Sequence, residues 1–166
     1  MKKIIVIGCP GSGKSHFSRE LNKITDIPLY HLDMMYWNSD KTTVEREIFL
    51  QEMSFVLEKD SWIIDGNYAS TMEMRMSASD TVIFLDYPVE ICLDGVKARR
   101  GKPRCDMPWF ETEEDKEFTQ FILNFNDQER PKILSLLDKY KNTKNILIFK
   151  SREDAEAFLA RKLNIN

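Results

Sequence analysis

Residues 8–15 read Gly-Cys-Pro-Gly-Ser-Gly-Lys-Ser, and this stretch decides the fold. It fits the pattern G-x-x-x-x-G-K-[ST] at every fixed position, in which glycines let successive backbone N–H groups point inward around an anion. The pattern needs a buried strand before it and a helix after it. Residues 4–7 read Ile-Ile-Val-Ile, a run typical of a strand buried on both faces. Apolar side chains at helical spacing follow Lys14, so we expect a phosphate-binding loop between the first strand and the first helix.

The residues of this loop have separate tasks. We expect Lys14 to reach the β- and γ-phosphates of a nucleotide, where it takes part in catalysis, and the Ser15 hydroxyl to bind Mg²⁺. The sequence therefore predicts an enzyme that uses ATP and Mg²⁺. The predicted nucleotide-binding residues are Gly8, Cys9, Pro10, Gly11, Ser12, Gly13, Lys14 and Ser15.

Length and composition restrict the class of protein. The chain has 166 residues, which suits a single domain over residues 1–166. Its net charge is −3, so it lacks the excess of basic residues typical of nucleic-acid binders, and we expect no direct DNA binding. Three cysteines are no disulfide framework, and no apolar stretch is long enough to cross a bilayer. We expect a cytoplasmic protein without membrane contacts; nothing in the sequence indicates an oligomeric state.

Strand and helix patterns alternate along the chain. The predicted strands are residues 4–7, 29–32, 62–64, 81–85 and 145–149. Helices are predicted at residues 14–24 and 88–100, and after Thr42, Thr112, Pro131 and Ser151. Thr42 with Glu45 has the pattern of a capping box. Five strands joined by helices predict an α/β fold with an open parallel sheet and helices on both faces, in which ligands bind at the carboxyl ends of the strands.

Three carboxylates follow predicted strands and should share the rim of the phosphate loop. Asp65 is the candidate for the Mg²⁺ site, directly or through water, and its alternative role is to start the Asp65-Gly66 turn. Asp86 is equally suited to cap the next helix. Asp33 is predicted to be catalytic, because a carboxylate there can take the proton of an acceptor hydroxyl. Tyr36 is predicted to hold a flat substrate beside Asp33, or else to belong to the core.

Basic residues near the predicted site are candidates for phosphate and substrate contacts. Residues 101–112 lack periodicity and are expected to form a short lid. Arg99 and Arg104 are predicted to act on the γ-phosphate from this lid, the alternative being a solvated helix end. Arg75 and Arg130 are single candidates for substrate binding, with a surface role as the alternative.

Three further residues near these elements are given structural roles. His16 is predicted to pack or to hydrogen-bond on the first helix, and His31 to be a satisfied core histidine. Cys9 is predicted to be a small residue that fits the loop.

With these residues identified, the sequence resembles the adenylate-kinase-like P-loop kinases. It resembles more closely the bacterial group of DNA topology modulation, or FlaR-like, proteins. The matching stretches are residues 8–15, His31-Leu32-Asp33 with Tyr36-Trp37, residues 62–68, residues 84–88 and residues 151–159.

The resemblance implies a three-layer P-loop NTPase fold with strand order 2-3-1-4-5 and a lid over the nucleotide. Asp65-Gly66 resembles the adenylate kinase step near Mg²⁺, but Asn67-Tyr68 replaces the Pro-Arg that contacts AMP there. Arg104-x-Asp106 is similar to the lid Arg-x-Asp of the family. Arg99 matches the second of two hinge arginines, and Gly95 takes the place of the first.

The main interpretation is an ATP-dependent phosphotransferase that acts on a small molecule such as a nucleotide or nucleoside. The segment from Asp33 to Tyr36 also resembles the Asp-x-x-Tyr of uridine-kinase-like enzymes, which phosphorylate a hydroxyl. Two alternatives stay open, an NTPase-type regulator affecting DNA topology and a DNA-binding regulator. The sequence leaves open whether the acceptor is a hydroxyl or a phosphate.

Overall fold

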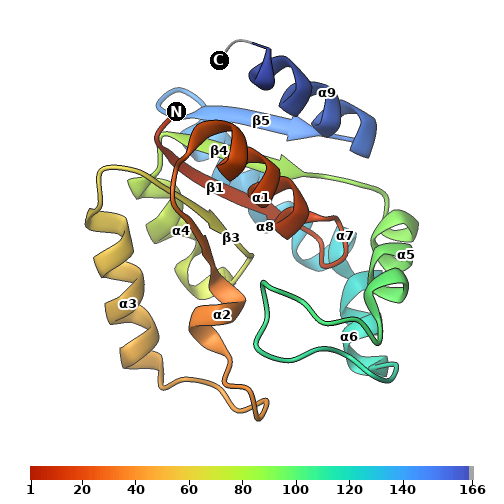
Figure 1. Ribbon diagram of the computed structural model, residues 1–166. Coiled ribbons are helices and arrows are strands. Elements are labelled where there is room, and N and C mark those ends of the chain that lie inside the picture. The colour runs from red at the N-terminus through yellow and green to blue at the C-terminus, as the bar shows by residue number, and fades with distance from the viewer. Residues whose placement is uncertain (165–166) are drawn as a thin grey trace.

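The computed structural model describes residues 1–164. Its centre is a parallel sheet of five strands in the order β2-β3-β1-β4-β5 (Figure 1). The strands are β1 (Lys3–Gly8), β2 (Leu29–His31), β3 (Trp62–Asp65), β4 (Thr81–Leu85) and β5 (Asn145–Phe149). The predicted fold class and the strand order implied by the resemblance are both confirmed.

Helices cover both faces of the sheet. Figure 1 shows α1 and α9 against one face and α4 and α8 against the other, which gives three layers. None of the described helices is long and apolar enough to span a membrane. The helices are α1 (Lys14–Thr25), α2 (Leu32–Tyr36), α3 (Arg46–Glu58), α4 (Ala69–Ala78), α5 (Val89–Arg99), α6 (Lys116–Leu123), α7 (Phe125–Gln128), α8 (Arg130–Tyr140) and α9 (Arg152–Leu163).

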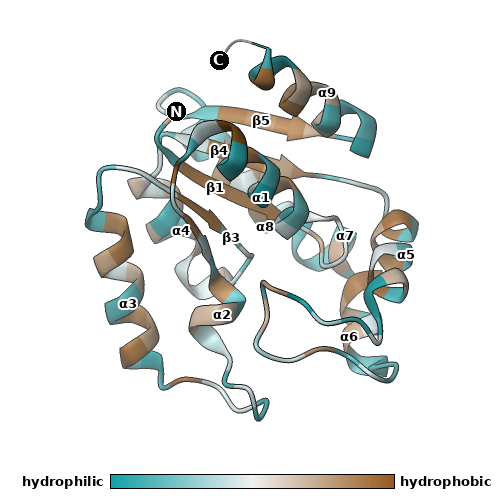
Figure 2. Cartoon of the chain, viewed as in Figure 1, coloured by the Kyte–Doolittle hydropathy of each residue, from teal (hydrophilic) through white to brown (hydrophobic). Residues whose placement is uncertain are grey.

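The core lies along the three central strands. The side chains of residues 4–7 and 63–64 are fully buried, as are those of residues 82–84, and the central strands are correspondingly hydrophobic in Figure 2. Burial of each such side chain contributes about 1.5–3 kcal/mol relative to exposure. Phe17 and Leu21 of α1 complete the core on one face. This packing fixes the position of β1, and the phosphate loop begins at the carboxyl end of that strand.

Local signals near the ends of elements were less reliable. The capping box at Thr42 is wrong, because α3 begins at Arg46 and the Thr42 hydroxyl donates to Asp40 instead. In α6 the cap is Asp115, whose side chain accepts from the backbone N–H of Phe118. Helix α4 was not predicted, since its Met, Ser and Thr residues give little amphipathic contrast. Helix α2 begins at Leu32 inside the expected second strand, so that Asp33 belongs to a helical turn.

The phosphate loop packs on α5 backbone against backbone. A Cβ added to Gly95 of α5 would lie 2.1 Å from the carbonyl oxygen of Gly11. A Cβ added to Gly11 would lie 2.0 Å from the carbonyl oxygen of Cys92. Gly11 also has a φ of +84°, in the left-handed region that favours glycine. This contact explains why a glycine stands where the adenylate kinase pattern has a hinge arginine.

The contact predicts an unusual sign for Gly95→Ala. Alanine normally stabilises a helix interior by about 1 kcal/mol relative to glycine. Here the added methyl group must displace the Gly11 carbonyl, so we expect a loss of about 1–3 kcal/mol in the free energy of unfolding. Denaturant unfolding measures the change, with Asp94→Ala at an exposed position of α5 as the control. A Gly95→Ala protein more stable than wild type would contradict the packing argument.

Candidate active site

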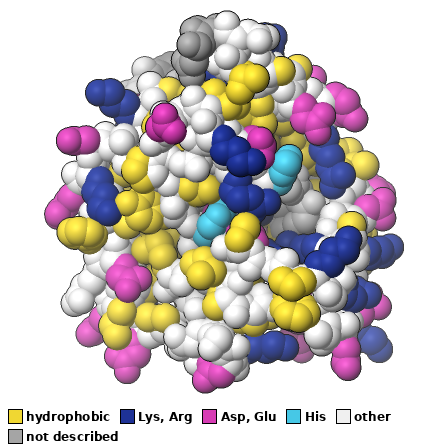
Figure 3. All heavy atoms as spheres, viewed as in Figure 1, with side chains coloured by type: hydrophobic (Ala, Val, Ile, Leu, Met, Phe, Trp, Pro, Cys, Tyr) yellow, Lys and Arg dark blue, Asp and Glu magenta, His cyan; other side chains and the backbone are white. Residues whose placement is uncertain are grey.

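A cavity of about 1200 Å³ opens at the carboxyl ends of the strands, over the phosphate loop. The face shown in Figure 3 is hollowed near its centre, and Lys and Arg side chains gather beside the hollow. Small-ligand sites usually have roughly 300–1,000 Å³, so this cavity has room for two ligands side by side. Its walls come from residues 10–17, from the segment after β3, and from residues 95–115.

The phosphate loop has the conformation that its glycines allow. Gly11 and Gly13 have φ values of +84° and +91°, and α1 begins directly after them at Lys14. The Lys14 ammonium group donates to the carbonyl oxygens of Gly8 at 2.9 Å and of Cys9 at 3.2 Å. Burial lowers the pKa of Lys14, while the nearby carboxylates act in the opposite direction. The loop thus combines a helix N-terminus with a buried ammonium group, an arrangement that attracts phosphate.

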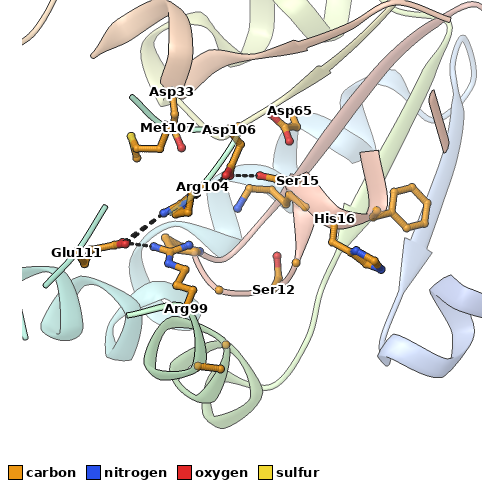
Figure 4. A pocket seen from close by; sticks show the side chains of 18 of the residues that line it. Ser12, Ser15, His16, Asp33, Asp65, Arg99, Arg104, Asp106, Met107 and Glu111 are labelled. Atoms are coloured by element: carbon orange, nitrogen blue, oxygen red, sulfur yellow. Dashed lines mark hydrogen bonds and ion pairs between the residues drawn. The ribbon is translucent and has the colours of Figure 1, made fainter. Parts of the chain in front are cut away.

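Ser12 gives a second sign that the loop is shaped for a ligand. Its hydroxyl is buried and has no hydrogen-bond partner within the described residues. Figure 4 shows the Ser12 side chain within the phosphate loop, at the wall of the cavity. A buried hydroxyl without a partner is costly, and a bound phosphate oxygen would satisfy it.

Both predicted arginines line the cavity, Arg99 from the last position of α5 and Arg104 from the segment between α5 and α6. Arg99 donates to Glu111 at 2.6 Å, and Arg104 contacts the same carboxylate at 3.3 Å. Arg104 also contacts Asp106 at 2.8 Å, and Asp106 accepts from the Ser15 hydroxyl (Figure 4). The network therefore links this segment to the last residue of the phosphate loop.

The network also fixes charge states. Burial alone would raise the pKa of Asp106, but its bonds to Arg104 and Ser15 hold it well below the ordinary value. The hydrogen bond of Arg104 likewise outweighs burial and raises its pKa. The side chains of Arg99 and Arg104 are 24% and 10% exposed and both pair with Glu111, so the alternative of a solvated helix end does not fit them. Sequence reasoning missed Glu111 and noted Asp106 only through the resemblance.

Asp65 lies at the end of β3 and is 4% exposed. The Nδ1 atom of His31 lies 2.9 Å from each oxygen of this carboxylate. Burial alone would lower the pKa of His31, but the hydrogen bond and charge of Asp65 outweigh it and raise the pKa. The prediction that His31 is a satisfied histidine is confirmed, and its partner is the candidate Mg²⁺ residue.

The side chains around Ser15 carry oxygen atoms that suit Mg²⁺. Asp65 and Asp106 lie beside Ser15 in Figure 4. Across residues 1–164 there is no group of three or more His, Cys, Asp or Glu side chains able to hold a metal alone. A hydroxyl with two carboxylates fits Mg²⁺, which keeps several waters and takes other ligands from phosphates. It does not fit zinc, which prefers four nitrogen or sulfur ligands.

Asp33 faces the cavity from the first turn of α2. Its carboxylate accepts a hydrogen bond of 2.6 Å from the Tyr68 hydroxyl. Burial raises the pKa of Asp33, although Tyr68 and Lys14 oppose this effect. A buried carboxylate with a raised pKa beside a phosphate site is suited to proton transfer.

An aromatic wall borders the cavity near Asp33. The rings of Trp37 and Trp109 meet edge to face with centroids 5.5 Å apart, and both line the cavity. The prediction that Tyr36 contacts the substrate does not fit its position. Its ring packs between Trp37, Phe49 and Tyr68, behind the cavity wall.

Arg75 was predicted to bind substrate, and its position contradicts this. The residue is fully buried in α4 and does not line the cavity. Its guanidinium donates to backbone carbonyls of residues 66–68 and to Thr71. The sequence indicated neither the helix nor the direction of this side chain.

Arg130 also lies outside the cavity wall. It forms a bidentate pair with Asp86 at 2.7 and 2.9 Å, and Lys150 contacts the same carboxylate. Burial alone would raise the pKa of Asp86, but these cations hold it below its ordinary value. Arg130 and Asp86 thus join α8 to the end of β4, and neither the substrate role of Arg130 nor the cap role of Asp86 fits.

Cys9 is nearly inaccessible, with 1% of its surface exposed. A hydrogen bond with the Cys92 thiol, together with burial, raises the pKa of Cys9 far above its ordinary value. The thiol is therefore a small buried group within the loop, as the sequence predicted.

No protein-family model matches the sequence, and no curated protein matches it. Among solved structures, the chain is similar to shikimate kinase from Bacteroides thetaiotaomicron at 17% identity and a TM-score of 0.56, covering 98% of this chain and 96% of that chain. It is similar to shikimate kinase from Acinetobacter baumannii in complex with shikimate at 14% identity and a TM-score of 0.62, covering 99% and 92%. At these identities the likeness shows the fold alone, a five-stranded parallel α/β sheet of the P-loop NTPase type. The closer relation to topology modulation proteins is not confirmed by these matches.

The position of Arg130 predicts a structural effect without a functional one. Arg130→Ala leaves the buried Asp86 with one cation, so we expect a loss of about 1–3 kcal/mol in the free energy of unfolding. The pKa of Asp86 is depressed in the folded state, so this loss should shrink as the pH falls through that pKa. Lys132→Ala on the exposed side of α8 is the control, with an expected change near zero. Weaker ATP binding by Arg130→Ala, measured by calorimetry, would restore its ligand role.

Proposed function

We propose that this protein transfers the γ-phosphoryl group of ATP to a hydroxyl group of a small molecule. The observation that carries the proposal is the shared cavity, in which the phosphate loop, two arginines and the carboxylate of Asp33 meet. The P-loop kinase fold supports the ATP half of the proposal. The acceptor half rests on Asp33 and its surroundings, because fold alone does not determine a substrate.

The donor half uses the loop from Gly8 to Ser15. Its backbone N–H groups and the Lys14 ammonium would hold the β- and γ-phosphates. Ser15 would hold Mg²⁺, with Asp65 and Asp106 in contact directly or through water. When bound, Mg²⁺ would neutralise charge on the phosphate oxygens.

Arg99 and Arg104 would carry positive charge to the transferred group. Before a phosphate binds, Glu111 holds both arginines at the cavity, and Asp106 also holds Arg104. Incoming phosphates would replace these carboxylates as partners of the arginines. Segment 100–115 would then close over the nucleotide and exclude water.

The acceptor half favours a hydroxyl over a phosphate. A hydroxyl must lose its proton during transfer, and Asp33 is a carboxylate with a raised pKa placed to accept it. An acceptor phosphate needs cations of its own, and the two arginines predicted for that role, Arg75 and Arg130, are both bound elsewhere. The indole rings of Trp37 and Trp109, which line the cavity, would contact an apolar face of the acceptor.

A second candidate is an NTPase in which hydrolysis drives a conformational change. It uses the same donor site, and the contact between Ser15 and Asp106 favours it, because a nucleotide there would bear directly on the lid. An effect on DNA topology would then be indirect, since the net charge of −3 gives no support to direct DNA binding. A cytoplasmic location remains a prediction from the sequence.

The donor half is tested by thermal unfolding with ATP and Mg²⁺. We expect the ligand to raise Tm, because binding to the native state stabilises it by about 2.7 kcal/mol at a hundredfold excess over Kd. Lys14→Ala should lose most of this increase. Lys23→Ala, an exposed lysine on the same helix, should keep it. Equal increases in wild type and Lys14→Ala would remove the basis of the proposal.

The acceptor half is tested with Asp33→Asn. A panel of nucleosides, nucleotides and small alcohols first identifies an active acceptor in the presence of ATP and Mg²⁺. Asp33→Asn should keep ATP binding and lose roughly a hundredfold or more in kcat, the usual scale of a general base. Because the base works only when ionised and its pKa is raised, wild-type kcat should fall on acidification at a higher pH than an ordinary carboxyl would give.

The control for this experiment is Asp40→Asn, on the exposed loop after α2, which should leave kcat unchanged. An Asp33→Asn enzyme with wild-type turnover and an unchanged pH profile would exclude the base role. Turnover only with phosphate acceptors would return the acceptor to the nucleoside monophosphates. Phosphate release from ATP without any acceptor would favour the NTPase.

A further inference from the structure

The segment Gly66–Asn67–Tyr68, between β3 and α4, is held from beneath by a buried arginine. Arg75 donates to the carbonyl oxygens of Gly66 at 3.0 Å and Tyr68 at 3.2 Å, and also to that of Asn67. Within the described residues it forms no ion pair with a carboxylate. Burial lowers its pKa to about 9, so it stays a cation at neutral pH. Loss of these bonds would leave a buried charge without hydrogen-bond partners. The free-energy cost of that state keeps the three carbonyls in place.

The side chain of Asn67 holds the first residue of the phosphate loop. Its Oδ1 atom accepts from the Gly8 N–H at 3.0 Å, and its Nδ2 atom donates to the Gly8 carbonyl at 2.8 Å. The Lys14 ammonium donates to the same carbonyl. One amide group therefore satisfies both backbone groups of Gly8, which fixes the loop at the point where β1 ends.

The next residue holds Asp33. Tyr68 has a φ of +36°, a left-handed conformation that costs energy for a residue with a Cβ. Its ring packs on Tyr36 and Phe49, and its hydroxyl donates to Asp33 at 2.6 Å. The surrounding bonds maintain this unfavourable backbone conformation, and the result is a hydroxyl aimed at the candidate base.

We propose that residues 66–68, fixed by Arg75, form a positioning loop that sets the phosphate loop and Asp33 at a constant separation. Asn67 acts through Gly8 on the donor side, and Tyr68 acts through Asp33 on the acceptor side. The Tyr68 arm rests on the proposed function, whereas the Asn67 arm requires only that the chain binds a nucleotide. Both are positioning residues and neither takes part in the chemistry.

The donor arm is tested with Asn67→Ala and isothermal calorimetry of ATP with Mg²⁺. Loss of both bonds to Gly8 should weaken nucleotide binding about tenfold. Asn22→Ala is the matched control, since its amide also donates to a loop carbonyl, that of Ile27, but away from the cavity. It should lower Tm without changing ATP affinity. Asn67→Ala with wild-type affinity would overturn this arm, whereas a wild type that binds no ATP would overturn the proposed function itself.

The acceptor arm is tested with Tyr68→Phe, which keeps the ring and removes only the hydroxyl. With an active acceptor, kcat should fall about tenfold while KM for ATP is unchanged. Tyr30→Phe is the matched control, because its hydroxyl bonds to Lys59 outside the cavity. An equal loss of kcat in Tyr68→Phe and Tyr30→Phe would mean that the effect comes from lower stability and not from the contact with Asp33. That result would overturn the acceptor arm.

A substitution at Arg75 should impair both the contact of Asn67 with Gly8 and the contact of Tyr68 with Asp33, because Arg75 holds residues 66–68. Arg75→Lys keeps the charge but not the fork of donors, so we expect both weaker ATP binding and lower kcat. Circular dichroism and Tm establish the folded fraction first. A folded Arg75→Lys enzyme with unchanged ATP affinity and kcat would show that the loop is not held by Arg75. The Asn67 and Tyr68 variants decide the two arms independently of the stability of Arg75→Lys.

Discussion

The backbone of the phosphate loop can bind an anion only when its N–H groups converge. Contacts from neighbouring elements hold the loop in that conformation. Gly8 is fixed by the amide of Asn67 and by the end of β1. Gly11 rests on the backbone of α5, where only a glycine at position 95 leaves room. The loop is therefore held by two elements that are remote in sequence, the segment around Asn67 and α5.

Charge in the site is balanced before any ligand arrives. Arg99 and Arg104 share Glu111, and Asp106 links Arg104 to Ser15. Each of these groups would be costly to bury alone, because low dielectric penalises an unpaired charge. Binding of a phosphate is then an exchange of anionic partners for the two arginines. Under the proposed function, such an exchange would require Glu111 and Asp106 to move, and occupancy of the phosphate loop would then affect the position of segment 100–115.

The sequence was informative where a pattern fixes backbone geometry. Short runs rich in apolar residues predicted the strands, and the glycines of residues 8–15 predicted the loop between β1 and α1. It was less informative about side-chain direction. Arg75 and Arg130 have the residue type of a substrate contact, but one points into the interior and the other across to Asp86. Tyr36 packs against Trp37, Phe49 and Tyr68. No local pattern in the sequence marked the start of α2 at Leu32.

The departure at Asn67-Tyr68 shows how one loop can change its task. In the adenylate kinase pattern that the sequence resembles, the residues after Asp-Gly include an arginine for the substrate phosphate. Here the same positions carry an amide bound to Gly8 and a phenol bound to Asp33. Compared with that pattern, residues 66–68 lack a cation for the acceptor. They instead contact Gly8 of the phosphate loop and the carboxylate of Asp33. A site built in this way suits an acceptor that must lose a proton rather than one that already carries negative charge. Under the proposed function, the preference for a hydroxyl acceptor therefore comes from residues 66–68, and not from the fold that this chain shares with the two shikimate kinases.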